Sequence, residues 1–336
     1  MRFWTLLPAV GRRVGKEIRR QKDVRAGILL LTPNLLRNDG TEEGLSDGDY
    51  PGLVNEILDN PKAGRVRVAA ALSRKKIRQE QGRFLVEGLQ AVRELLVHRP
   101  ELAETVYVSL DGDQRLIEVD RLVDEAEASP RRDGRELPFV RVTAPVLAAM
   151  AETVTPQGVI AVARSWEAVD PEQQATALAK ALSGARLVAI MHEVRDPGNA
   201  GTVLRAADAA GADAVVFAGA SIDPFHPKVV RSTTGSLFHL PVVTAPDLAA
   251  AIDAARAAGL AVLAADVNGA ELAPGDPALT GSVAWVFGNE ARGLTEDERE
   301  LADAARRLPI YGAAESLNLA TAASVCLYTT AFAQRA

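Results

Sequence analysis

Short apolar runs alternate with alanine-rich segments of helical period through the second half of this chain. Such runs indicate strands that are buried on both faces, and the intervening segments indicate helices that cover them. The strands are predicted near residues 187–191, 214–217, 240–243, 261–265 and 283–287. The pattern is typical of an α/β domain built on a parallel sheet.

A smaller α/β alternation occupies residues 61–165. It begins with a basic helix whose apolar side is formed by Val66, Ala69, Ala70 and Leu72. Strands are predicted at 83–87, 106–108, 139–142 and 158–163, and helices through 89–96, 121–128 and 146–151. We interpret this segment as a separate domain.

Three boundaries follow from these patterns. Residues 166–184 read as a linker with some helix, and residues 185–336 form the second domain. Residues 1–60 contain a basic stretch, a short apolar patch and an acidic Gly/Asp-rich run, but no core. We therefore expect residues 1–60 to be a poorly ordered extension.

Composition narrows the class of protein. Hydrophobic residues make up 48% of the chain and charged residues 24%, as in soluble globular proteins. The single cysteine excludes a disulfide framework, and the four histidines show no ligand spacing, so we expect no metal. No apolar run approaches the roughly 20 residues needed to cross a bilayer, and the amino terminus lacks a signal-peptide core. We expect a protein of the reducing cytoplasm that does not bind membranes.

Charge is distributed unevenly along the chain. The net charge is -6, yet residues 62–99 contain ten Lys or Arg against three Glu. A basic segment on an acidic protein indicates a surface for a polyanion such as RNA, although a solvated helix face would have the same composition. The candidate RNA contacts are Arg74, Lys75, Lys76, Arg78 and Arg83.

Two glycine-bearing loops near the carboxyl end are the first candidates for chemistry. One loop, Gly288 to Leu294, follows the strand at 283–287 and precedes a predicted helix at 295–303, which Thr295 and Glu298 would open. The other loop runs from Leu308 to Asn318 and opens the last helix. In open α/β sheets the ligand lies beyond the carboxyl ends of the strands, so both loops should line one pocket.

A third segment, Val188 to Gly211, reads as a strand, an Asp-Pro-Gly turn and a helix. The three blocks, in this order and spacing, resemble the SpoU (TrmH-like) branch of the SPOUT superfamily. These proteins are knotted, S-adenosylmethionine-dependent RNA ribose 2′-O-methyltransferases. The resemblance covers roughly residues 80–334, and the run from Gln81 to Gly88 looks like the start of the substrate-binding domain that precedes many SpoU catalytic domains.

The resemblance implies an α/β fold in which a parallel-sheet SPOUT domain with a carboxy-terminal trefoil knot follows a small α/β RNA-binding domain. It places S-adenosylmethionine against the main chain around Gly288, Leu308, Ile310 and Leu317. It also implies a homodimer with the active site near the interface. The small residues of the last helix favour the same assembly, because they permit close helix contact.

The candidate catalytic residues are Arg205, Asn199, Ser316, Asn318 and Glu290. Arg205 stands among apolar neighbours, where an unpaired guanidinium would be costly, so a partner anion or an interface is expected. The family's motif has an arginine at this place, often assigned to activating the 2′-hydroxyl. Because arginine stays protonated in proteins, we favour a clamp on the substrate phosphate and the developing alkoxide, with water or a phosphate oxygen as the proton acceptor.

The other candidates have a structural alternative each. Asn199 is a natural N-cap of its helix, and Ser316 and Asn318 could cap the last helix instead of holding substrate or cofactor. Glu290 matches the family's acidic position and would either order its loop or meet Arg205.

Other functions remain as alternatives. A dinucleotide-dependent oxidoreductase is disfavoured, because no G-x-G-x-x-G follows the first strand of either domain. A non-catalytic RNA-binding factor could keep the same fold. Ribosomal RNA is favoured over transfer RNA by the presence of the amino-terminal domain, which the shorter transfer-RNA enzymes of the family generally lack.

Overall fold

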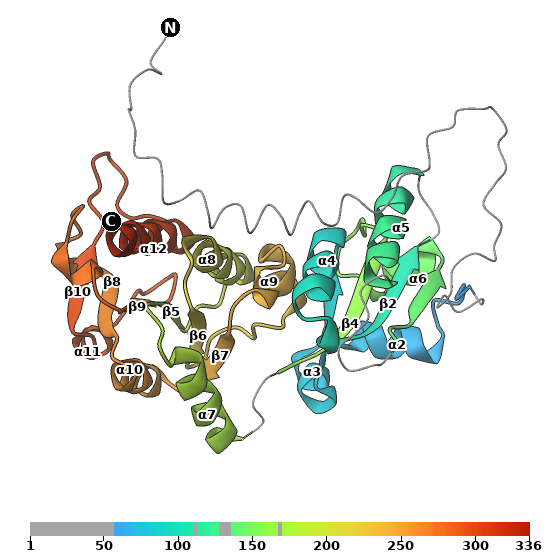
Figure 1. Cartoon of the computed structure of the whole chain (residues 1–336), viewed down its shortest axis with the longest axis horizontal. Coiled ribbons are helices and arrows are strands. Elements are labelled where there is room, and N and C mark those ends of the chain that lie inside the picture. The colour runs from blue at the N-terminus through green and yellow to red at the C-terminus, as the bar shows by residue number, and fades with distance from the viewer. Residues whose placement is uncertain (1–56, 110–112, 128–135, 167–169) are drawn as a thin grey trace, which may run out of the picture. The chain divides into compact units, whose positions relative to one another are not determined.

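The computed structural model describes residues 57–109, 113–127, 136–166 and 170–336 (Figure 1). Most of the extension expected at 1–60 lies outside the described residues. Leu58, however, forms a bridge to Val142 and is 7% exposed. The folded part therefore begins before residue 61.

The first domain is built on a four-stranded sheet in the order β1-β4-β2-β3. Its strands are β1 (Arg83–Glu87), β2 (Ala103–Ser109), β3 (Phe139–Val142) and β4 (Val159–Arg164). β4 pairs antiparallel with both β1 and β2, whereas β2 and β3 are parallel. All four predicted strands of this domain are confirmed.

Helices pack on this sheet. They are α2 (Gly64–Ala71), α3 (Lys75–Gln81), α4 (Leu89–His98), η1 (Pro100–Leu102), α5 (Asp113–Glu127) and α6 (Ala144–Met150). The predicted basic helix is in fact two helices, because Arg74 has extended backbone angles and separates α2 from α3. Val66, Ala69 and Leu72 are buried, as the sequence predicts.

The second domain contains a six-stranded sheet in the order β10-β8-β9-β5-β6-β7, and every neighbouring pair is parallel. Its strands are β5 (Leu187–His192), β6 (Ala214–Ala218), β7 (Val242–Ala245), β8 (Ala261–Glu271), β9 (Val283–Phe287) and β10 (Ala304–Arg307). The sequence did not predict β10, because its four residues, Ala-Ala-Arg-Arg, form an edge strand that lacks an apolar run. The sheet confirms the expected parallel α/β domain.

Alternate residues of each central strand face opposite layers of helices. In β5, Ala189 and Met191 join a core with α8 (Pro197–Ala210) and α12 (Leu319–Arg335), whereas Val188 and Ile190 join a core with α7 (Pro171–Leu182) and α10 (Leu248–Ala257). Helices on both faces explain why β5 is buried along its whole length. The helix expected in the linker is α7, and it belongs to the second of these layers.

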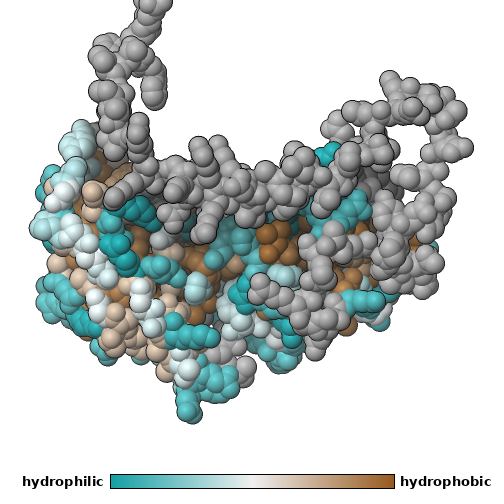
Figure 2. Space-filling view, in the orientation of Figure 1, coloured by the Kyte–Doolittle hydropathy of each residue, from teal (hydrophilic) through white to brown (hydrophobic). Residues whose placement is uncertain are grey.

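The remaining short elements connect these layers. They are α9 (Pro227–Ser232), η2 (Ser236–Phe238), η3 (Pro277–Leu279) and α11 (Glu296–Glu300). Thr295 and Glu298 form a capping box at α11, as predicted, but the helix ends at Glu300 so that the chain can enter β10. On the face seen in Figure 2, hydrophilic and hydrophobic residues are interspersed. Within the described ranges, no helix combines the length and apolar character needed to cross a membrane.

A buried ion pair joins the two domains. Arg78 of α3 is 3% exposed, and its Nε and Nη2 atoms donate to Oδ2 of Asp223 at 2.9 and 2.6 Å. Its Nη1 atom donates to the carbonyl oxygens of Leu72 and Ser73. The prediction that Arg78 contacts RNA is therefore wrong, because its guanidinium is enclosed and fully engaged.

Arg78→Ala should lower the free energy of unfolding by about 3–5 kcal/mol, since it leaves the buried carboxylate of Asp223 without its counter-charge. Chemical denaturation measures the loss. Arg74→Ala, at an exposed neighbouring position, is the matched control and should change stability by no more than about 0.5 kcal/mol. Equal stabilities for the two variants would contradict the structural role of the pair.

Candidate active site

The turn after β5 sets the direction of helix α8. Glu193 has a positive φ of 51°, and the carboxylate of Asp196 accepts the main-chain N–H of Asn199 at 2.7 Å. Asp196 is therefore the N-cap of α8, and Pro197 occupies its first turn. The alternative that Asn199 is the N-cap is wrong, and its side-chain amide makes other contacts.

Glu290 holds the turn after β5 from the loop after β9. Its Oε1 atom accepts the main-chain N–H of Asp196 at 2.9 Å, and its Oε2 atom accepts that of Arg195 at 3.1 Å. The side-chain amide of Asn199 donates to Oε1 at 3.4 Å. Of the two roles expected for Glu290, the structure shows the ordering of the loop and not a contact with Arg205.

Asn318 connects the last helix to the same cluster. Its Oδ1 atom accepts the main-chain N–H groups of Ala320 and Thr321, so it caps α12. Its Nδ2 atom donates to Oδ1 of Asn199 at 3.0 Å. Asn318 thus caps its helix and also reaches the site, and three segments far apart in sequence meet through Glu290, Asn199 and Asn318.

Arg205 lies almost two turns into α8. Its neighbours Val203, Leu204 and Ala207 are fully buried, whereas Arg205 faces solvent, because the helix turns about 100° per residue. The expected partner anion or interface for this guanidinium is therefore not supplied by the described part of the chain, and that expectation stays a prediction. Among the described residues, the guanidinium has no hydrogen-bond or ion-pair partner, so it is free to meet an anion from outside.

Ser316 is the one candidate for which the structure shows no link to the cluster. It is exposed in the loop that precedes α12. No side-chain hydrogen bond joins it to the residues described. Its role stays a prediction.

The candidate cofactor loops leave the same edge of the parallel sheet, after β9 and β10. A side chain at Gly288 would come within 2.7 Å of the main chain of Gly293, so the first loop is a tight turn that only glycine permits. On the second loop, Leu308 packs partly into the core, while Ile310 and Leu317 are 38% and 40% exposed. The assignment of these residues to the cofactor stays a prediction.

An ionic network supports the first loop, and the sequence did not reveal it. Arg292 donates to both carboxylate oxygens of Glu298, at 2.6 and 2.8 Å, and to Glu193 at 3.1 Å. His192, buried at the end of β5, lies 2.8 Å from Oε1 of Glu298. The Arg292 hydrogen bonds, with those from Thr295 and His192, hold the pKa of Glu298 far below its ordinary value of 4.5. Only the Thr295 and Glu298 capping pair was visible as a sequence pattern.

The proposed RNA contacts divide into three groups. Arg74, Lys75 and Lys76 are exposed at the start of α3. Arg83 is 45% exposed but pairs with Glu104 at 2.6 Å. Lys76 makes a 3.7 Å ion pair with Glu80 but is 84% exposed. Because Arg78 is buried, Arg74, Lys75 and Lys76 are the candidates whose charges face solvent without a close ion pair.

Two family models match the chain. The SpoU rRNA Methylase family model matches residues 186–328, and the MRM3-like substrate binding domain model matches residues 63–161. The first match contains Asn199, Arg205, Glu290 and Asn318. The second contains the exposed cations of α3.

Individual proteins resemble nearly the whole described chain. This chain is 32% identical to the 23S rRNA (guanosine(2553)-2′-O)-methyltransferase RlmP of Bacillus subtilis, over 81% of this chain and 97% of that protein. The AdoMet-bound rRNA methyltransferase from Sinorhizobium meliloti is 28% identical with a TM-score of 0.65, over 83% of this chain and 98% of that one. The SpoU methyltransferase AviRb from Streptomyces viridochromogenes, in complex with the cofactor AdoMet, is 27% identical with a TM-score of 0.65. That match covers 81% of this chain and 99% of AviRb.

Glu298→Gln should flatten the loss of stability on acidification. Because the folded-state pKa of Glu298 lies below its ordinary 4.5, its contribution is present above that pH and declines as the pH falls through the folded-state value. The melting temperature measured from pH 6 down to about pH 2 should therefore fall less steeply in the variant. Glu296→Gln is the control, because Glu296 is 78% exposed and makes only a 3.8 Å contact with Arg299. Parallel acid profiles for Glu298→Gln and the unchanged chain would contradict the network.

Proposed function

This chain belongs to the SpoU rRNA methylase family, and on that premise we propose that it transfers the methyl group of S-adenosylmethionine to a ribose 2′-hydroxyl of ribosomal RNA. The observation that carries the proposal is the cluster of Glu290, Asn199 and Asn318 at the start of α8, the helix that also carries the solvent-exposed Arg205. A protein that only bound RNA would not need this set of residues. Methyltransferases among the relatives and solved neighbours support the same activity.

The chain's own residues would bind and orient the reactants. S-adenosylmethionine supplies, when bound, a methyl group on a sulfonium that a ribose oxygen can attack. Gly288, Leu308, Ile310 and Leu317 would hold it through main-chain groups and apolar contacts. Asn318 and Ser316, at the head of α12, would position the ribose.

Arg205 would act as an electrostatic clamp. Its guanidinium stays protonated, so it cannot serve as the general base. It would instead grip the phosphate next to the reacting ribose and stabilise the negative charge that develops on the 2′-oxygen. The hydroxyl proton would pass to water or to a phosphate oxygen.

Ribosomal RNA is the substrate we favour. The first domain matches a substrate binding domain model, and the relatives with printed substrates include 23S rRNA methyltransferases. Transfer RNA methylation and RNA binding without catalysis are the alternatives. Mapping 2′-O-methyl sites in RNA from a deletion strain separates these three functions. The compartment we propose is the cytoplasm.

We also propose the trefoil knot expected for this family. After β10 at one edge of the sheet, the chain returns to α12, which packs beside β5, β9 and α8. The bond between Asn318 and Asn199 fixes the start of that return next to α8. A path of this kind is compatible with threading of the residues after Leu308 through an earlier loop.

The assembly we propose is a homodimer that forms through the exposed apolar residues of α12, not through its small residues. The small residues of α12, including Ala320, Ala323 and Cys326, are buried in the chain's own core, so they are not open to a partner. The outer side of α12 instead presents Val325, Tyr328 and Phe332, which are 42%, 38% and 69% exposed. Such an apolar stripe supports a helix-to-helix contact between two copies.

Arg205→Ala should reduce methyl transfer by roughly 10²-fold or more, the scale for removal of a preorganised charge at a reacting oxygen. Cofactor affinity and melting temperature should change little, because Arg205 is exposed. Arg205→Lys should not restore activity, since lysine lacks the planar fork that binds phosphate in a bidentate manner. Lys180→Ala, an exposed cation of α7, is the control. Near-native activity in Arg205→Ala would remove it from the site.

Reversing Arg74, Lys75 and Lys76 to glutamate should weaken RNA binding and flatten its dependence on salt. Each lost phosphate contact lowers the slope of log K against log[salt] by roughly one. Titration at several salt concentrations measures the slope, and Lys180→Glu is the control. Equal loss of S-adenosylmethionine affinity would indicate misfolding rather than lost phosphate contacts.

Light scattering should give twice the chain mass of 35.6 kDa for the unchanged protein. Phe332→Glu should shift it toward the monomer, because a charge would be buried in the apolar contact. Val267→Glu, at a position that is 68% exposed on β8, should leave the dimer intact. A fully active monomer would contradict the proposed assembly.

A further inference from the structure

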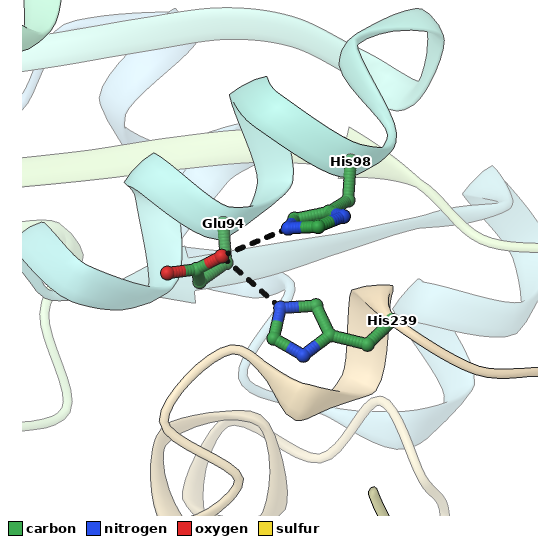
Figure 3. A group of neighbouring side chains, drawn as sticks. All are labelled: Glu94, His98 and His239. Atoms are coloured by element: carbon green, nitrogen blue, oxygen red, sulfur yellow. Dashed lines mark hydrogen bonds and ion pairs between the residues drawn. The ribbon is translucent and has the colours of Figure 1, made fainter. Parts of the chain in front are cut away.

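Two histidines and one carboxylate meet outside the residues assigned to methyl transfer (Figure 3). Glu94 and His98 are one turn apart on α4 of the first domain, and His239 follows η2 of the second. The Oε2 atom of Glu94 lies 3.2 Å from Nε2 of His98 and 3.1 Å from Nε2 of His239. One carboxylate oxygen therefore faces a nitrogen atom of each imidazole.

The two distances from Glu94 match the separation of ligands around a small metal ion. With bonds of 2.0–2.1 Å to nitrogen, two ligands of a tetrahedral Zn²⁺ ion lie about 3.3 Å apart. One ligand atom from each of the three residues lies within 4.8 Å of the other two. Two imidazoles and a carboxylate are a common protein ligand set for zinc, which accepts water as its fourth ligand.

The surrounding groups orient these side chains for coordination. Asp208 of α8 places its Oδ2 atom 2.8 Å from Nδ1 of His239. A carboxylate there favours the proton on Nδ1, as outer carboxylates do for metal-binding histidines, so that Nε2 could bind a metal in place of its 3.1 Å contact with Glu94. Gln90 donates to the second carboxylate oxygen of Glu94 at 2.5 Å, which restricts the rotation of that group.

The main chain just before η2 lies very close to α4. Gly235, just before η2, has a φ of 101°, and a side chain there would meet Cγ of Glu94 at 2.3 Å. Only glycine therefore lets this loop approach α4. The histidine rings lie against each other, with centroids 4.4 Å apart.

We propose that Glu94, His98 and His239 bind one divalent transition-metal ion, for which Zn²⁺ is the best match, and that the ion fastens α4 to η2. Asp208 orients His239 without contacting the metal. The three side chains are 18–45% exposed, so the ion can enter from solvent and carry water at the fourth position. No histidine spacing in the sequence pointed to this site, because His98 and His239 are brought together only by the fold.

The test is zinc binding by the tag-free, full-length chain after dialysis against EDTA. Titration with ZnCl₂, together with elemental analysis, should show one ion per chain. His98→Ala, His239→Ala and Glu94→Gln should each raise Kd by at least about 100-fold, and Asp208→Asn by about 10-fold, the scale seen for the loss of outer partners. Visible absorption of the Co²⁺-loaded protein should report four-coordinate geometry.

Matched controls keep the outcome decisive. His226→Asn alters a histidine outside the cluster, keeps an acceptor for the N–H of Lys228, and should bind zinc as the unchanged chain does. His98 is 45% exposed, so His98→Ala should melt as the unchanged chain does in EDTA, but zinc should no longer raise its melting temperature. A chain that binds no zinc, or that binds it equally tightly in His98→Ala and His239→Ala, overturns the proposal. Because the readout is metal binding, neither result depends on methyl transfer.

Discussion

The parallel pairing of β5 with β9 is the constraint on which the candidate active site depends. Almost a hundred residues separate the two strands, yet they run side by side from Leu187 opposite Val283 to Met191 opposite Phe287. Because the pair is parallel, the following loops leave the same edge of the sheet. Glu290 can then accept the N–H groups of Arg195 and Asp196, and Asn289 can donate to the carbonyl oxygen of Glu193 at 2.8 Å.

The register of that pairing is fixed by burial on both faces. In β5, Ala189 and Met191 face the layer of α8 and α12, while Val188 and Ile190 face that of α7 and α10. A slip of one residue would exchange the two sets and change the volume of both cores. The packing of the core therefore also fixes where the loops of the candidate site lie.

The junction between the domains combines interactions of different physical kinds. Aromatic rings of Phe84, Trp166 and Phe225 pack together, with centroids 4.8 Å apart for two of the three pairs. The ion pair of Arg78 and Asp223 is buried beside this apolar contact, where its directional hydrogen bonds tolerate less misalignment than packing does. Packing and directional hydrogen bonds together hold the first domain against the second.

The order of elements and the parallel sheet could be predicted from the sequence, and its resemblance to a known family supplied most of the candidate residues. Apolar periodicity records burial directly, so strands such as β5 and β9 could be identified, and the glycine loops and the Asp-Pro-Gly turn are local in the chain. The contact partner of a side chain cannot be read from its neighbours in the sequence. Whether Arg205 is exposed, whether Arg78 meets RNA or Asp223, and whether His98 meets His239 depend on contacts between residues far apart in sequence. Those contacts form only when the strands pair and the two domains pack, so they could be read only from the folded chain.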